Sequence, residues 1–95
     1  MKILAKPSFR IENVVASITI NQNIDLDVIS VNVPGVEYNP EQFPGLIYRL
    51  SKPRTATLIF SSGKMVCTGA KHEDEVKIAV EKVYERLKEL GVLYE

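Results

Sequence analysis

Alternating hydrophobic and polar residues mark the strands that the chain is expected to form. Residues 13–20 (NVVASITI) are rich in β-branched side chains, and their even-numbered positions form one plainly apolar face. Such alternation predicts a half-buried strand. Three more strands are predicted in quick succession at Leu46–Leu50, Thr55–Phe60 and Met65–Thr68, because the spacers between them have hairpin length.

Two other segments have the longer period that is typical of helices. Asp25 can cap a short helix in which Leu26, Ile29 and Val33 share a face, before a Pro-Gly pair ends it. The acidic residues 73–75 suit the start of a second helix, which Gly91 ends. The apolar stripe of this helix is expected to consist of Val76, Val80, Val83, Leu87 and Leu90. A short strand at Val36–Tyr38 precedes the turn-rich residues between the two halves of the chain.

These elements predict an antiparallel α+β domain with helices on one face of its sheet and the other face uncovered. Residues 1–95 are expected to form one domain, because so short a chain can bury only one modest core. The uncovered face would carry Asn13, Val15, Ser17, Thr19, Ile47, Arg49, Ala56, Leu58, Phe60, Val66 and Thr68. A soluble monomer rarely leaves such an apolar patch bare, so we expect something flat to cover it.

The charge distribution changes this picture. Twelve Lys and Arg residues balance twelve Asp and Glu residues, but residues 42–72 contain five cations and no Asp or Glu, whereas residues 73–95 contain seven anions and four cations. The five cations flank the apolar patch in sequence and are Arg49, Lys52, Arg54, Lys64 and Lys71. An apolar floor with a basic rim fits the minor groove of DNA, whose walls are sugars and whose edges are phosphates.

Candidate catalytic and metal-binding residues are few. The single cysteine, Cys67, excludes a disulfide framework and a multi-thiolate metal site. Cys67 and His72 are the only candidates for a nucleophile and its base, and the sequence shows no third group to orient them. We therefore expect no enzyme activity and no cofactor. No apolar run approaches the roughly 18 residues of a membrane helix, so a membrane is not an expected partner.

Three motifs, NVVAS (13–17), EYNPEQFPGLIYR (37–49) and KPRTATLIFSSGKMVCTGAK (52–71), closely resemble one repeat of the TATA-box-binding protein family. The wording of residues 13–17 and 65–71 is most like the first repeat of an archaeal member. The resemblance covers nearly the whole chain, and it implies a curved, five-stranded antiparallel sheet with two helices on one face, forming half of a saddle. It also implies a general transcription factor that binds the minor groove of TATA-box DNA and bends it.

The resemblance assigns roles to individual residues. Phe43 and Phe60 match the pair that wedges between base steps, and Asn13 matches an asparagine that donates hydrogen bonds to minor-groove acceptors. The floor positions are Val15, Ser17, Leu58, Val66 and Thr68, and the phosphate-side positions are Arg49, Arg54, Ser62 and Lys64, with Lys71 as a further candidate. Without the resemblance, each of these three residues also fits a purely structural role. Phe60 could be an aromatic residue of the core, Phe43 an anchor of its loop, and Asn13 a residue at a strand edge or in a bulge.

Only one repeat of the two found in the family is present, so the first strand would be an exposed edge. We expect a symmetric homodimer joined along that strand, or pairing with a second repeat. The alternatives are an isolated half-domain, a protein-interaction module that docks through the acidic face of the second helix, and a binder of RNA or single strands. A B-type initiation factor is a further expected partner. The expected location is the nucleoid in the cytoplasm of an archaeon, or the nucleus of a eukaryote.

Overall fold

A computed structural model describes residues 14–93 and confirms the predicted α+β architecture. The five strands form one antiparallel sheet in the order β1-β5-β4-β3-β2. The strands are β1 (Val14–Thr19), β2 (Glu37–Tyr38), β3 (Leu46–Ser51), β4 (Arg54–Ile59) and β5 (Lys64–Ala70). The helices are α1 (Leu26–Asn32) and α2 (Glu73–Glu89).

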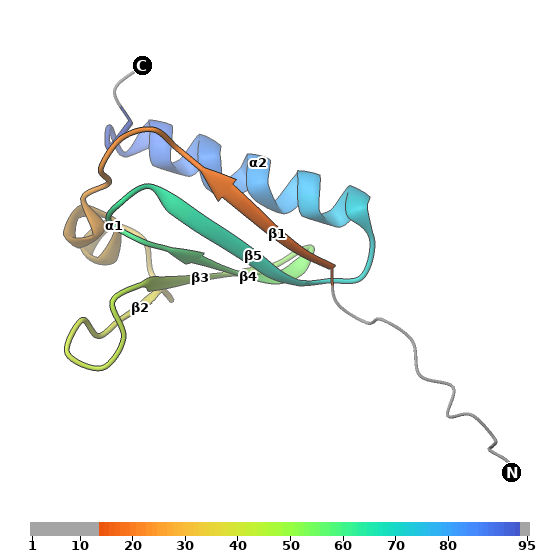
Figure 1. The fold of residues 1–95 in the computed structure, drawn as a ribbon, viewed down its shortest axis with the longest axis horizontal. Coiled ribbons are helices and arrows are strands. Elements are labelled where there is room, and N and C mark those ends of the chain that lie inside the picture. The colour runs from red at the N-terminus through yellow and green to blue at the C-terminus, as the bar shows by residue number, and fades with distance from the viewer. Residues whose placement is uncertain (1–13, 94–95) are drawn as a thin grey trace, which may run out of the picture.

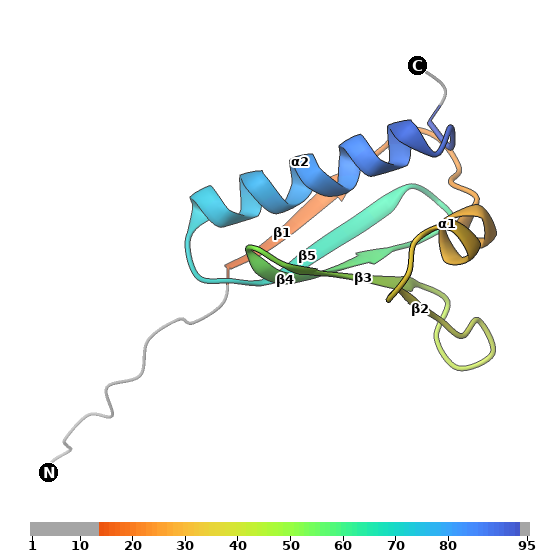
Figure 2. The ribbon, with the colours of Figure 1, turned by 180° about the vertical axis from the view of Figure 1, so that it is seen from behind.

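Both helices lie on the same face of the curved sheet, as Figures 1 and 2 show. Helix α2 runs along the sheet and contacts β1, β5 and β4. The core between the layers includes Leu46 and Ile59 from the sheet and Val83 and Leu87 from α2, all fully buried. No helix of residues 14–93 lies over the opposite face of the sheet, so this part of the fold leaves one broad surface open.

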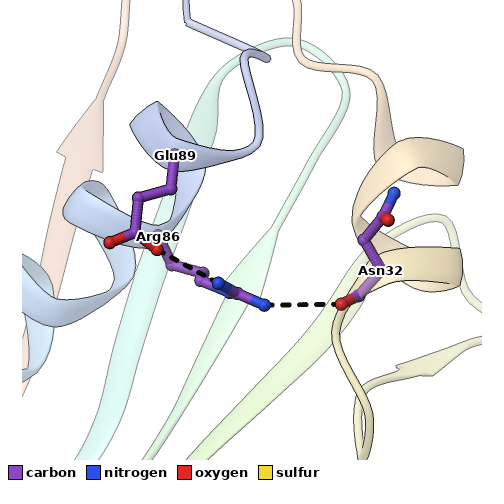
Figure 3. Close-up of polar contacts among 3 residues, drawn as sticks. All are labelled: Asn32, Arg86 and Glu89. Carbon is purple, nitrogen blue, oxygen red and sulfur yellow. Dashed lines mark hydrogen bonds and ion pairs between the residues drawn. The ribbon is translucent and has the colours of Figure 1, made fainter.

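Local signals in the sequence set the ends of the helices. The Asp25 carboxylate accepts hydrogen bonds from the backbone N–H groups of Asp27 and Val28, and so caps α1 as predicted. At the far end of α1, the Arg86 guanidinium of α2 donates to the Asn32 carbonyl and pairs with Glu89, 3.0 Å away (Figure 3). The last carbonyls of a helix have no partner within the helix, so the Asn32 carbonyl is available to Arg86. The contact joins the C-terminal ends of α1 and α2.

The predicted stripe of α2 is wrong in one respect. Val83 and Leu87 are buried, but Val76 and Val80 are only half-buried, and Ala79 is fully buried in their place. The small Ala79 side chain lets the first half of α2 approach the sheet closely, so the buried line runs through Ala79, Val83 and Leu87 at a spacing of four. Among the described residues, no helix is both long and apolar enough to cross a membrane.

The strand bounds also differ slightly from the prediction. Strand β5 continues two residues further, to Ala70, and β4 ends at Ile59. Phe60 therefore lies just beyond β4, where its backbone N–H donates to the Lys64 carbonyl across the turn. Because Phe60 lies outside the strand, the alternation along β4 does not by itself fix the direction of its side chain.

Candidate nucleic-acid interface

The strand register arranges the open face in rows that run across the sheet. One row crosses all five strands and consists of Ser17, Val66, Leu58, Ile47 and Glu37, each directly opposite the next. Directly opposite residues point to the same side of an antiparallel sheet. The three middle members are apolar and half-buried. They form a shallow, mostly apolar floor that the rest of residues 14–93 leaves accessible to solvent.

A second row lies beside the first and joins Thr68, Ala56 and Arg49. Its continuation onto β1 is irregular, because the pairing of β1 with β5 shifts register between Val14 and Ala16. Val15 lies at this irregularity and is 63% exposed, which is high for a strand valine. The bulge therefore presents Val15 at the β1 edge of the floor.

Two phenylalanines lie together at one end of the open face. Figures 1 and 2 show the loop of residues 39–45 projecting from the end of the sheet, away from the helices. The ring of Phe43 in this loop meets the ring of Phe60 edge to face, with 5.8 Å between centroids and 66° between planes. Both rings pack over Gly45, where an added Cβ would lie 2.9 Å from Phe43 and 3.0 Å from Phe60. Phe43 is nonetheless 38% exposed, so a partner can reach it.

Cations lie at both ends of the strands that form the floor. Because β4 and β5 are antiparallel, Arg54 at the start of β4 lies near Lys71, and Lys64 at the start of β5 lies near Ser62 at the other end. The turn that holds Ser62 and Lys64 depends on Gly63, whose φ is 98° and whose missing Cβ would lie 2.1 Å from the Ile20 carbonyl oxygen. The six residues of β4 span about 17 Å, which sets the distance between the two basic rims.

A hollow of about 360 Å³ adjoins the first of these rims. It is lined by Arg49, Leu50, Arg54, Thr55, Ala56, Thr68 and Gly69. Within residues 14–93, Arg54, Lys64 and Lys71 form no ion pair, so their charges are available to a partner.

Arg49 differs from the other cations. Its guanidinium pairs with the Glu37 carboxylate at 2.7 Å, although both side chains are more than half exposed, at 53% and 59%. The sequence motifs contain both residues but do not place them together. Glu37 shares the open face with Arg49 only because β2 pairs with β3 so that Glu37 lies opposite Ile47.

The helix-covered side carries a groove of its own. It measures about 430 Å³ and is lined by Tyr48, Ile78, Glu81, Lys82, Glu85, Arg86 and Glu89. Lys82 donates to the Lys52 carbonyl, and Arg86 is held by Glu89 and Asn32. Burial raises the pKa of the Tyr48 hydroxyl, against the opposing effect of Arg86 and with a smaller contribution from Glu89. Three exposed acidic residues and the two cations thus surround a small apolar floor on this side.

The two candidate catalytic residues, Cys67 and His72, do not form a site, because one is buried and the other is exposed. Cys67 is fully buried between sheet and helix, and burial raises the pKa of its thiol above the ordinary range despite the neighbouring Thr57 hydroxyl. His72 lies at the exposed N-cap position of α2, where its side chain makes no capping hydrogen bond. Across the described part of the chain, no group of three or more His, Cys, Asp or Glu residues could hold a metal ion.

The predicted DNA-contact residues fall into three groups in the structure. Val15, Ser17, Leu58, Val66 and Thr68 share the open face, Phe43 and Phe60 form one aromatic pair, and Arg54, Ser62 and Lys64 lie at the strand ends. Arg49 lies on the same face but is paired with Glu37. Asn13 lies outside the described residues. Sequence reasoning missed Glu37 and Gly45, because only the register and the loop packing give them their neighbours.

Comparisons with known proteins agree with this geometry. Residues 8–90 match the sequence model of the family described as transcription factor TFIID (or TATA-binding protein, TBP). The chain is similar to the TATA-box-binding protein of Pyrobaculum aerophilum, with 54% identity over 88 residues that cover 93% of this chain and 44% of the relative. It is also 54% identical to TATA-box-binding protein B of Halobacterium salinarum over 85 residues, which cover 90% of this chain and 46% of that protein.

A solved structure, described as Methanococcus jannaschii TBP, matches the fold with a TM-score of 0.79 and 47% sequence identity. The match covers 83% of this chain and 47% of the other. The chain thus spans somewhat less than half the length of the relatives that it matches.

Proposed function

Because the chain belongs to the TATA-binding protein family and forms a single repeat of it, we propose that its open sheet face binds the minor groove of TATA-like duplex DNA and bends it. In this role it is half of a general transcription factor that marks promoters for initiation. The observation that carries the proposal is the uncovered apolar floor with an aromatic pair at one end and free cations at both strand ends. The residues proposed to form the DNA-facing surface are those that the sequence motifs indicated, with Asn13 among them, although Arg49 is held by Glu37.

The chemistry of the floor favours A·T pairs. The minor groove shows A·T and T·A pairs as the same acceptors, whereas a G·C pair adds the protruding amine of guanine. Leu58 and Val66 offer no acceptor to that amine and would be pushed away by it. Ser17 and Thr68 supply hydroxyl donors on the same face. Such a surface separates A·T from G·C without separating A·T from T·A.

The width of the floor requires the groove to open. An undistorted minor groove is about 6 Å wide, and the strands of the floor span about 17 Å between their basic rims. Contact with both rims therefore needs a flattened and widened groove. Apolar wedges between base steps achieve this in minor-groove binders, of which this family is itself the best-known illustration. Phe43 and Phe60, packed edge to face at the end of the floor, are placed to act as such a wedge.

One repeat offers only half of a saddle. Strand β1 is an edge of the sheet, and its outer side has no partner among the described residues. We infer that a second half-saddle, either an identical subunit or another repeat, pairs along β1. A slip of one residue would turn the partner's floor to the helix side, so pairing must set the residues Val15, Ser17 and Thr19 opposite open-face residues of the partner. A strictly monomeric mass at micromolar concentration would contradict self-pairing.

A second candidate function uses the other side of the molecule. The groove beside α2 has an apolar floor of Tyr48 and the 46% exposed Ile78, and its rim carries three acidic residues and two cations. Lys82 and Arg86 already have partners within the chain, which leaves the carboxylates of Glu81 and Glu85 to a partner protein. The groove therefore fits docking of a basic protein segment, alone or together with DNA binding. A B-type initiation factor is the partner that the family relationship suggests for the DNA-bound form.

The proposal is tested by energy transfer between fluorophores at the two ends of a TA-rich duplex of roughly 20 base pairs, titrated with the protein. We expect transfer to rise on this duplex and to stay unchanged on a G·C-rich duplex of equal length. Binding without any rise would contradict bending, and equal binding of both duplexes would contradict A·T selection. Absence of binding at every protein concentration would leave the docking function beside α2, which pull-down with a basic helical peptide can test separately.

A further inference from the structure

One exposed ion pair lies within the surface that we assign to DNA. Glu37 and Arg49 meet at 2.7 Å on the open face, at the side of the floor away from β1. Glu37 ends the row that crosses all five strands, and Arg49 belongs to the adjacent row. The negative charge of a carboxylate repels phosphates, so the presence of Glu37 on a face that binds DNA requires an explanation.

The pairing is specific to Arg49. Of the cations assigned to the phosphate side, Arg54 and Lys64 form no ion pair within residues 14–93, and neither does the further candidate Lys71. Arg49 is also the cation that comes from the middle of the face rather than from its ends, because it lies directly opposite Ala56. A guanidinium free to move there could lie across the apolar floor or contact any phosphate that came near.

The Glu37 carboxylate opposes both outcomes. It accepts from one guanidinium nitrogen and draws the Arg49 side chain towards β2, off the centre of the floor. It also cancels most of the charge that Arg49 would present to DNA. Because sequence-independent binding to DNA is almost entirely electrostatic, a cancelled cation weakens attachment to any duplex.

We propose that Glu37 is a positioning residue that withholds Arg49 from phosphates and thereby lowers the electrostatic share of DNA binding. This inference rests on the proposed minor-groove function. It predicts that the surface behaves as if it carried one phosphate contact fewer than its sequence suggests, and that removing the Glu37 charge restores that contact through Arg49 and no other residue.

The test measures how the affinity for the TA-rich duplex depends on salt, using the full chain. Each phosphate contact adds about 0.9 to the slope of log affinity against log salt. For Glu37→Gln we expect a slope steeper by about 0.9 and binding up to about fivefold tighter at low salt, since exposed ion pairs are worth no more than roughly 1 kcal/mol. The matched control is Asp27→Asn, which removes one negative charge from the exposed first turn of α1 on the helix side and should leave the slope unchanged.

A double-mutant cycle identifies the residue through which Glu37 acts. In an Arg49→Gln background, Glu37→Gln should no longer change the slope. An unchanged slope in Glu37→Gln alone would overturn the inference while leaving the proposed function intact. An equal change in the Arg49→Gln background would also overturn it, because Glu37 would then act as a general surface charge. A wild-type chain that binds no duplex would overturn the proposed function and this inference together.

Discussion

Replacing Phe60 by alanine tests the wedge most directly. The Phe60 ring lies just beyond the end of β4 and touches Phe43, so its removal leaves the sheet register and the basic rims in place. The substitution deletes one ring of the proposed wedge and leaves the second ring with space to turn. It should therefore affect the bent complex more than the attachment of the protein to DNA.

The expected magnitude follows from what the ring can contact. A base stacked on an aromatic side chain contributes about 1–3 kcal/mol, which corresponds to roughly 5- to 150-fold in affinity. That loss should fall on the TA-rich duplex alone, because loose binding to the G·C-rich duplex depends on charges that Phe60→Ala does not change. Loss of the contact with Phe43 removes about 0.5–1.5 kcal/mol from folding, which unfolding in urea measures separately.

The assay is end-to-end energy transfer at saturating protein, together with the dissociation constants for both duplexes. Leu58→Ala is the control, because Leu58 lies on the same open face but in the floor. It should weaken binding without lowering the transfer reached at saturation, whereas Phe60→Ala should lower that plateau. Equal losses on the two duplexes, or an unchanged plateau for Phe60→Ala, would refute the wedge.

Three further predictions concern charge and stability. Within residues 14–93, Arg54, Lys64 and Lys71 are the phosphate-side candidates that form no ion pair, and they predict a salt slope of about −2.7 for one half-saddle and about −5.4 for a pair. Raising salt from about 50 to about 200 mM should then weaken binding roughly 40-fold for one half-saddle and more than about 1000-fold for a pair, and a slope near zero would exclude phosphate contact. Among the described residues, the fully buried Thr57 hydroxyl has no hydrogen-bond partner other than the weakly bonding thiol of the opposite Cys67. Thr57→Val should therefore raise the free energy of unfolding by about 1 kcal/mol, and a clear loss of stability in a urea titration would contradict this. Burial raises the pKa of Cys67 in the folded state, so the unfolded chain loses its thiol proton at a lower pH, and the free energy of unfolding should fall as pH rises from about 7 to about 10. This decrease with pH should be shallower in Cys67→Ala, and an equal decrease in both proteins would show that other groups cause it.

Much of the fold follows from local signals in the sequence. Strict alternation in the strands predicts which residues face the helices. Asp25 caps the start of α1, and Gly91 follows the end of α2, through local chemistry that needs no tertiary contact. The sequence motifs also indicate which residues belong to the open face. The exception is α2, where the sequence favours Val76 and Val80 as the buried residues and the structure buries Ala79. In the first half of α2, the short distance between helix and sheet buries the small Ala79 side chain in preference to the more hydrophobic valines.

The register of the strands, and with it the neighbours of each side chain across the sheet, was decided by the tertiary structure. Glu37 and Arg49 are twelve positions apart in the sequence and form an ion pair because β2 pairs with β3 in one particular register. Phe43 and Phe60 are in contact because the loop before β3 packs both rings over Gly45. Periodicity assigns a residue to a face but carries no information about which residue of another strand lies opposite. Register depends on the summed packing of whole strands, so the sequence alone determined the faces of this protein, and the assembled sheet decided which charges and rings act together.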